Sequence, residues 1–488
     1  MSCFLLLLLL IVGATVTGGA SPPDLSYSVI IDAGSTGSRL HVFSFVSGPG
    51  DDAPTVSSLS NEVFEEVKPG LSSFANAQEA GESLRPLMLS AMSSVPETKR
   101  VVTGVELKAT AGLRLIGATA SSAILEAVMQ LFRDFPFHTS ESSVEIMDDD
   151  HEGPYGWLTI NYLLGSLRPH GREPIQCENA VATAAAIDMG GASTQVVFEW
   201  KSGSSLLSGS RSEDAALTEQ RSHAYPVPWL SSTDDGCHGT HGTNTVKPAA
   251  GPLALYQHSH LGYGLMEARK AVLSSRSDAC GAEGTFATCV DACLNFLRPA
   301  SAEKHCKLRT AAVTPLSIPW ACSINATFQP PLADVLGTGG YQQRGRLYAF
   351  SYYYDRFAHF FSKPQVANAA ARHSENAGME PSAGVVNLSW MRSIAMNLCG
   401  TRVPTDLSLF HPWGVAETDI LNWFETQRTA PFACFDATYL YAVLAYGYEL
   451  PPHTEIVIAK KVRGVETAWP LGAALAALSS RTSFRQTR

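Results

Sequence analysis

Two short segments of the chain resemble each other, and their aspartates, Asp32 and Asp188, lie 156 residues apart. The segments are residues 31–42 and 187–198, and they align without a gap. In both, an apolar run ends in aspartate, a turn rich in glycine and serine follows, and a second apolar run leaves the turn. This pattern predicts two β-hairpins with an aspartate at the end of each first strand, and the spacing predicts a duplicated fold.

The composition of the two turns suits phosphate binding. Glycine lets the backbone come close to a ligand, and the N–H groups and hydroxyls of such a turn can hold phosphate oxygens. A single hairpin of this kind is most simply interpreted as an ordinary turn. Two copies, separated by about the length of a domain, favour a phosphate site formed by both turns together.

An acidic helix start lies between the two hairpins. The stretch 147–165 predicts a helix that has Pro154 in its first turn and ends at Gly165. Glu152 then lies at or just before the helix N-terminus, where its side chain can face a cleft. Most of the acids in 148–152 also have a simpler interpretation, as solvated residues stabilised by the helix dipole.

Length and charge limit the class of protein. A chain of 488 residues with 45% hydrophobic residues predicts two domains with a large core. The formal net charge of −10 argues against a nucleic-acid partner, because a phosphate backbone requires a positive surface.

Residues 101–109 alternate apolar and polar side chains and predict a strand.

The N-terminus predicts entry into the secretory pathway. An apolar run over 4–16 is followed by small residues at 17–20, which indicates a cleaved signal peptide over residues 1–20, with a short uncleaved anchor as the alternative. No other stretch approaches the roughly 20 apolar residues that a membrane span needs. Sequons at Asn325 and Asn387 can carry glycans in that compartment.

The cysteines support an oxidising compartment. Ten are present, and nine remain once Cys3 is removed with the leader, so at least one thiol is left unpaired. The run Cys237–His241 also allows a zinc interpretation, but no paired CxxC or HExxH accompanies it, and a disulfide is the simpler fate for Cys237.

Taken together, six ordered segments resemble the nucleoside triphosphate diphosphohydrolases, or apyrases. Within that family, the resemblance is strongest to the endomembrane guanosine and uridine diphosphatases. The six segments cover roughly residues 27 to 475 and are 32–39, 108–114, 152–157, 188–195, 348–355 and 469–473. The acidic run at 148–150 departs from the glycine-containing stretch that the family pattern leads us to expect. This departure concerns the loop before Glu152 and leaves the match at Glu152 itself unchanged.

The resemblance implies an α/β fold of two actin-like (ribonuclease-H-like) domains with the active site in the cleft between them. It implies a first domain of residues 24–150 plus 460–488 and a second, disulfide-bearing domain of 151–459. It also implies disulfides Cys306–Cys322 and Cys399–Cys434 and, less directly, a pairing of Cys237 with Cys280 or Cys289.

The resemblance further implies the roles of the site residues. Glu152 would be the catalytic base, and Asp32 and Asp188 would hold Mg²⁺ or Ca²⁺, mainly through water. The residues expected to contact the nucleotide or its phosphates are Ser35, Thr36, Gly37, Ser38, Thr110, Gly191, Ala192, Ser193, Gln195 and Tyr353.

Several alternatives stay open at this point. An aromatic residue of 352–354 could stack on the nucleobase or belong to the core. Arg39 and Arg114 could contact substrate or brace their own turns. The expected activity is hydrolysis of GDP and UDP by a monomer in the secretory pathway, either secreted or in the Golgi or ER lumen. The alternatives are a general secreted apyrase acting on ATP and ADP, and a non-catalytic actin-like nucleotide-binding protein of the lumen.

Overall fold

The structure is a computed structural model. It describes residues 24–46, 59–169, 181–199, 224–227, 230–232, 253–281, 284–297, 346–361, 365–368, 383–399, 416–426, 432–448 and 450–486. The predicted signal peptide and the sequon at Asn325 lie outside these residues, as do Cys177, Cys237, Cys306 and Cys322.

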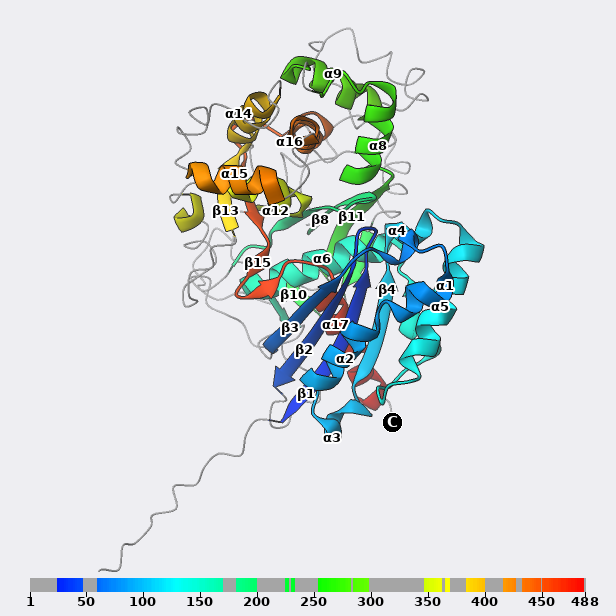
Figure 1. Cartoon of the computed structure of the whole chain (residues 1–488). Helices are drawn as coiled ribbons and strands as arrows, with labels where there is room; N and C mark the ends of the chain where they lie inside the picture. Colours follow the sequence, from blue (N-terminus) through cyan, green and yellow to red (C-terminus); the bar gives the residue numbers. More distant parts are fainter. Residues whose placement is uncertain are drawn as a thin grey trace, which may run out of the picture.

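The first sheet has five strands and lies in the N-terminal part of the chain (Figure 1). Its order is β3 (Leu59–Val67), β2 (Ser38–Val46), β1 (Leu25–Ala33), β4 (Gly104–Ala109) and β5 (Val144–Ile146). The pairs β1–β2 and β2–β3 are antiparallel, whereas β4 runs parallel to both β1 and β5.

The second sheet has seven strands and contains the same arrangement again. Its order is β13 (Ala383–Asn387), β14 (Glu455–Ala459), β12 (Leu347–Ser351), β7 (Ala185–Met189), β8 (Ser193–Glu199), β11 (Leu253–Leu261) and β9 (Ala224–Val227). The pairs β7–β8 and β8–β11 are antiparallel, and β7–β12 and β12–β14 are parallel. The strands β11-β8-β7-β12-β14 therefore repeat the pattern of β3-β2-β1-β4-β5, which is the duplicated ribonuclease-H-like fold.

The remaining strands form two small sheets, and thirteen α-helices are described. The small sheets pair β6 (Leu167–Pro169) with β10 (Leu230–Ser232) and β15 (Lys461–Val462) with β16 (Val465–Glu466). The helices are α1 (Ala77–Glu82), α2 (Arg85–Ser94), α3 (Glu97–Arg100), α4 (Ala111–Arg114), α5 (Ala118–Phe132), α6 (Asp149–Leu164), α8 (Leu265–Ser275), α9 (Phe286–Leu297), α12 (Tyr352–Phe357), α14 (Leu388–Leu398), α15 (Glu417–Thr426), α16 (Ala433–Ala442) and α17 (Pro470–Gln486).

The core is divided into three helical layers separated by the two sheets. Successive side chains of a strand point to opposite faces of the sheet. Val29 and Ile31 of β1 therefore pack in the layer that includes α2 and α5, and Ile30 packs in the layer of α6 and α17. In β7, Ala186 faces that same central layer, whereas Ile187 faces α8, α9, α14 and α16. The helices α6 and α17 thus fill the space between the sheets, and α17 contacts β1 and β2 (Figure 1).

Most predicted elements are present, with two differences at element ends. Both hairpins form as predicted. The predicted strand over 101–109 begins only at Gly104, because Val101 caps the end of α3 and its side chain is two-thirds exposed (66%). Helix α6 begins at Asp149, so Glu152 lies within its first turns and Pro154 lies inside the helix; the helix ends at Gly165 as predicted. The division into domains at residues 150 and 460 stays a prediction.

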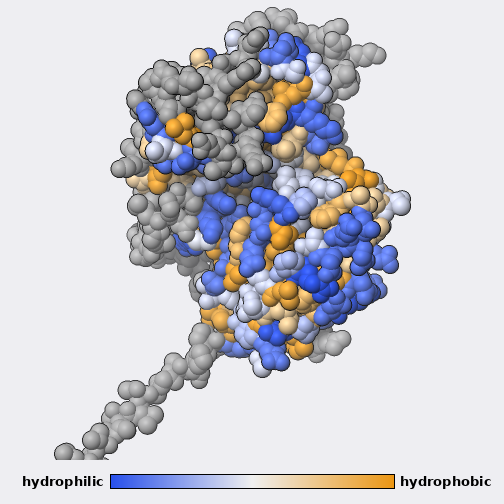
Figure 2. Space-filling model, viewed as in Figure 1, coloured by the Kyte–Doolittle hydropathy of each residue, from blue (hydrophilic) through white to orange (hydrophobic). Residues whose placement is uncertain are grey.

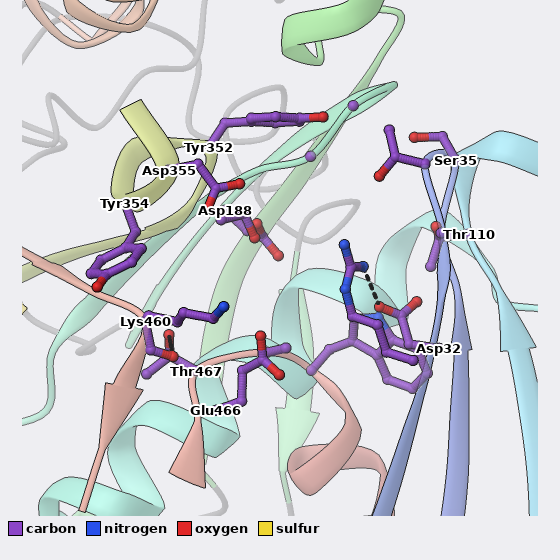
Figure 3. A pocket seen from close by; sticks show the side chains of 18 of the residues that line it. Asp32, Ser35, Thr110, Asp188, Tyr352, Tyr354, Asp355, Lys460, Glu466 and Thr467 are labelled. Atoms are coloured by element: carbon purple, nitrogen blue, oxygen red, sulfur yellow. Dashed lines mark hydrogen bonds and ion pairs between the residues drawn. The ribbon is translucent and has the colours of Figure 1, made fainter. Parts of the chain in front are cut away.

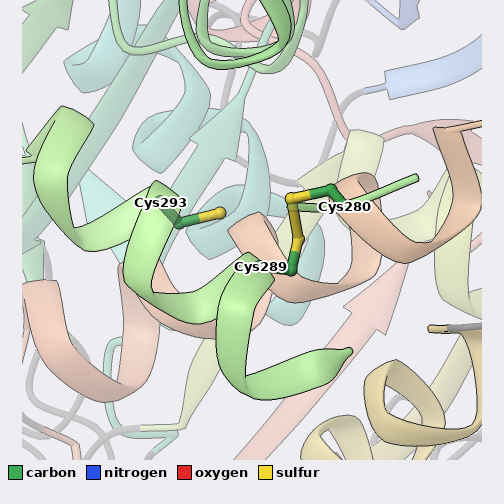
Figure 4. A group of neighbouring side chains, drawn as sticks. All are labelled: Cys280, Cys289 and Cys293. Atoms are coloured by element: carbon green, nitrogen blue, oxygen red, sulfur yellow. A yellow bond between two sulfur atoms is a disulfide. The ribbon is translucent and has the colours of Figure 1, made fainter. Parts of the chain in front are cut away.

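Two disulfides lie among the described residues. The predicted Cys399–Cys434 bond is confirmed. The predicted partnership of Cys237 with Cys280 or Cys289 is wrong, because Cys280 and Cys289 are bonded to each other (Figure 4). Cys293, one turn further along α9, is buried and has no disulfide partner among the described residues. Disulfides persist in oxidising compartments, in agreement with a secretory-pathway protein.

The described surface mixes hydrophilic and hydrophobic residues (Figure 2). The exposed large apolar side chains include Leu89, Val101, Val102 and Leu115. Within the described residues, no helix combines the length and apolar character required to cross a bilayer.

Candidate active site

A pocket of about 590 Å³ lies between the two hairpin turns (Figure 3). The first turn contributes Asp32, Ser35 and Thr36 to its lining, and the second contributes Asp188 and residues 190–193. Thr110, Glu152, the start of α12 and residues 466–469 complete much of the wall. The pocket therefore gathers side chains from both sheets and from both ends of the chain.

Asp32 and Asp188 occupy equivalent positions, each at or next to the end of the first strand of its hairpin. One oxygen of Asp32 accepts a hydrogen bond from Arg39 Nη1 at 3.3 Å, across the same hairpin. Asp188 accepts a hydrogen bond from Ser351. The Oδ1 atom of each aspartate is buried and has no hydrogen-bond partner among the described residues. Each carboxylate thus keeps one oxygen available to a ligand in the pocket.

Glu152 reaches the pocket from α6, and its carboxylate is held by Arg114. Arg114 Nη2 donates to Glu152 Oε2 at 2.7 Å, so this arginine does not only brace its own turn. Gly153 lets the helix approach β8, because a Cβ atom there would lie 2.7 Å from the side chain of Val197. Glu152 and Gly153 thus have different roles: Glu152 brings a carboxylate to the pocket, and Gly153 allows α6 to pack closely against β8.

Burial raises the pKa values of all three carboxylates. The pKa of Glu152 rises to about 7; Arg114 opposes the rise, and the charges of Asp188 and Asp32 add to it. Burial likewise raises the pKa of Asp188 to about 6, against the hydrogen bond from Ser351. The pKa of Asp32 is also raised by burial, although Arg39 opposes it. Three ionised carboxylates in one pocket are costly unless a positive group joins them.

This arrangement predicts how stability depends on pH in the presence of a chelator. A carboxyl whose pKa is higher in the folded protein than in the unfolded chain stabilises the fold at low pH, and this stabilisation is lost as pH rises through the folded value. Glu152→Gln removes that titration. We therefore expect the melting temperature of the variant, relative to the parent, to increase between about pH 5 and pH 8. A difference that stays constant with pH would contradict the raised pKa.

The two turns lie close together across the pocket. A Cβ atom added at Gly191 would lie 2.4 Å from Ser35 Oγ and 3.6 Å from Thr36. Thr110 caps the short helix α4, and its N–H donates to the carbonyl of Ala33 at 3.2 Å. Hydroxyls and backbone groups from both turns and from α4 therefore surround one small volume, as a phosphate group requires.

Four of the predicted contact residues do not line the pocket. Gly37 and Ser38 lie behind the first turn, where the side chain of Ser38 is fully buried. Gln195 is buried beside Ser193 and donates to its hydroxyl at 2.8 Å. Tyr353 has no exposed surface and packs in the core of the second sheet. The tyrosines that line the pocket are instead its neighbours Tyr352 and Tyr354 (Figure 3).

Other pocket residues were not predicted from sequence. Ser351 has a positive φ of 57°, which a residue with a side chain rarely adopts, and it binds Asp188. Trp469 hydrogen-bonds to Asp32, and Lys460 also lines the pocket. Trp469 and Ser351 belonged to segments that resembled the family, but no pattern in either segment indicated a contact with an aspartate.

A duplicated ribonuclease-H-like fold, with paired Gly- and Ser-rich turns and carboxylates in the cleft, defines an enzyme of the actin-like class that acts on phosphate groups. A model of the GDA1/CD39 (nucleoside phosphatase) family matches residues 20–229 and 416–487, and the chain belongs to this family. Members of the family generally use divalent cations.

Similar proteins match over nearly the whole chain. A guanosine-diphosphatase from Schizosaccharomyces pombe is 31% identical, and the match covers 95% of this chain and 75% of the relative. The nucleoside diphosphate phosphatase ENTPD5 from Homo sapiens is 32% identical over 93% of this chain and 88% of its own. A crystal structure of a nucleoside triphosphate hydrolase from Neospora caninum superposes with a TM-score of 0.48 at 15% identity, over 94% of this chain and 93% of the other.

Proposed function

We propose that this enzyme hydrolyses the terminal phosphate of nucleoside diphosphates, preferring GDP and UDP, and that triphosphates are hydrolysed more slowly. The observation that carries the proposal is the convergence of Asp32, Glu152 and Asp188 in one pocket between two phosphate-type turns. Two relatives, a guanosine-diphosphatase and a nucleoside diphosphate phosphatase, support the choice of diphosphates by the activities in their names.

In this proposal Glu152 accepts a proton from the water that attacks the terminal phosphate. Its buried carboxylate lines the pocket, and a pKa near 7 suits a group that must take up a proton near neutral pH. Arg114 binds Oε2 of the Glu152 carboxylate. Its ion pair therefore does not occupy the other oxygen, Oε1. Gln195, which lies beside Gly153 and outside the pocket lining, would act through Ser193, to whose hydroxyl its amide donates.

The residues of the pocket fit a hard divalent cation, and we propose Mg²⁺ or Ca²⁺. The unpartnered Oδ1 atoms of Asp32 and Asp188 support this choice, since carboxylate oxygens and water are the ligands that these ions prefer. Asp32 and Asp188 would hold the ion mainly through water, and Thr110 would join this shell. When bound, the ion neutralises negative charge on the phosphates.

Ser35 and Thr36 would hold the terminal phosphate from the first turn, and Gly191, Ala192 and Ser193 would hold phosphate oxygens from the second. For the nucleobase we now propose Tyr352 or Tyr354 in place of Tyr353, because both line the pocket. Aromatic rings stack on any nucleobase, so this wall alone does not select guanine or uracil.

The substrate preference is tested with purified enzyme. We expect kcat/KM for GDP and UDP to exceed that for ATP, because a third phosphate would shift the base relative to the aromatic wall when the terminal phosphate is held between the turns. Phosphate release is measured for each nucleotide with the cation present and no acceptor added. A tenfold advantage for ATP would replace this proposal with the general apyrase. No release from any nucleotide would leave a non-catalytic binding protein.

A further inference from the structure

A buried carboxylate outside the pocket binds two arginines at once. Asp436 lies on α16, and only 1% of its surface is exposed. Arg269 of α8 donates to both of its oxygens, from Nε to Oδ1 at 3.1 Å and from Nη2 to Oδ2 at 2.5 Å. Arg356 of α12 donates from Nε to Oδ2 at 2.7 Å. One negative charge therefore holds two positive charges within the core of the second sheet.

The first of these arginines, Arg356, connects Asp436 to the pocket. Arg356 lines the pocket, and its guanidinium carbon lies 5.0 Å from the centre of the Tyr352 ring. A guanidinium at this distance from an aromatic face attracts the ring and favours its present position. The hydroxyl of Tyr352 also hydrogen-bonds to Thr36 of the first turn. The orientation of the aromatic wall thus depends on where Asp436 holds Arg356.

The second arginine, Arg269, connects Asp436 to the second phosphate turn through helix α8. Helix α8 begins directly on that turn, and the N–H groups of Leu265 and Met266 donate to the carbonyls of Gly190 and Gly191, both at 2.9 Å. Gly264 makes this contact possible, because a Cβ atom there would lie 2.4 Å from the backbone of Ala192. Arg269, four residues along the same helix, then joins α8 to Asp436.

We propose that Asp436 is a positioning residue that fixes Tyr352 relative to the second phosphate turn, through Arg356 on one side and Arg269 on the other. The inference rests on the proposed function, in which Tyr352 or Tyr354 contacts the nucleobase, and it commits to Tyr352. It assigns Asp436 and its arginines to recognition of the base, at a distance from the phosphate chemistry. A purely structural network would not require that one of its cations line the pocket, as Arg356 does.

The test compares two substrates that differ only in the nucleobase, GDP and ribose 5-diphosphate. Arg356→Lys and Arg269→Lys keep the charge but lose the planar, directional contacts of a guanidinium. We expect each to raise KM for GDP by about tenfold with kcat changed by less than about threefold, and to leave KM for ribose 5-diphosphate unchanged. Asp436→Asn is expected to act in the same direction; if it does not fold, the two lysine variants carry the test.

A double-mutant cycle then asks whether Arg356 acts through Tyr352. Tyr352→Leu combined with Arg356→Lys is expected to have no higher KM for GDP than Tyr352→Leu alone. Lys270→Gln is the matched control, since Lys270 neighbours Arg269 on α8 and its side chain is 79% exposed. Equal effects on both substrates, or additive effects in the cycle, would overturn the inference. Failure of the parent enzyme to hydrolyse GDP would instead overturn the proposed function.

Discussion

Glu152→Gln is expected to fold and to bind nucleotide like the parent enzyme, while its turnover falls by about 10²-fold or more. Glutamine has nearly the size of glutamate, so the packing of α6 against β8 is retained. It cannot accept the proton that the attacking water must lose. Its amide can still contact Arg114, so the pocket keeps its shape.

The measurement is single-turnover phosphate release, with nucleotide affinity determined separately by calorimetry. Asp150→Asn is the matched control, because Asp150 lies two residues earlier in the same helix and is exposed. This control is expected to keep the parent turnover. Near-parent turnover in Glu152→Gln would remove Glu152 from the mechanism and would require another base in the pocket.

Asp32→Ala and Asp188→Ala are each expected to lower activity by about 10²-fold or more, and a chelator is expected to abolish activity in the parent. The two aspartates come from equivalent strands on opposite sides of the pocket, and each has a buried oxygen without a partner among the described residues. Loss of either would leave the cation bound from one side only.

Cation binding also has a readout that does not depend on catalysis. Adding Mg²⁺ or Ca²⁺ to the chelated parent is expected to raise its melting temperature, because the ion relieves repulsion among buried carboxylates. The double variant Asp32→Ala, Asp188→Ala is expected to lose this response. Asp291→Ala, at an exposed position on α9, is the control and is expected to retain it. Full activity in chelator would contradict a role for the cation.

Local patterns explain why much of the fold was predictable. Each hairpin is specified by residues adjacent in sequence, and so is the helix that carries Glu152. The boundary at Val101 was wrong because alternation continued into residues that cap α3. The five-layer order of helices and sheets has no local signal, since Ile30 and Ala186 meet one core layer only after the chain has folded.

Site residues were predictable where a carboxylate lies near the end of a strand or the start of a helix. Asp32, Asp188 and Glu152 all have this property, and the structure brings them into one pocket. The choice among three successive tyrosines was not predictable, because it depends on the backbone at Ser351, whose positive φ sets the direction of α12. Trp469 was not assigned because its contact with Asp32 spans most of the chain.

The position of the C-terminal segment has a consequence for biosynthesis. The backbone N–H of Glu466 donates to Glu62, a contact between residues 404 positions apart, and α17 covers one face of β1 and β2. During translation, that face of the first sheet stays uncovered until residues 466–486 have left the ribosome. A nascent chain that carries both phosphate turns therefore has no complete pocket, because the wall at Trp469 is added last. A chain that stops before residue 469 lacks this wall of the pocket and is expected to be inactive.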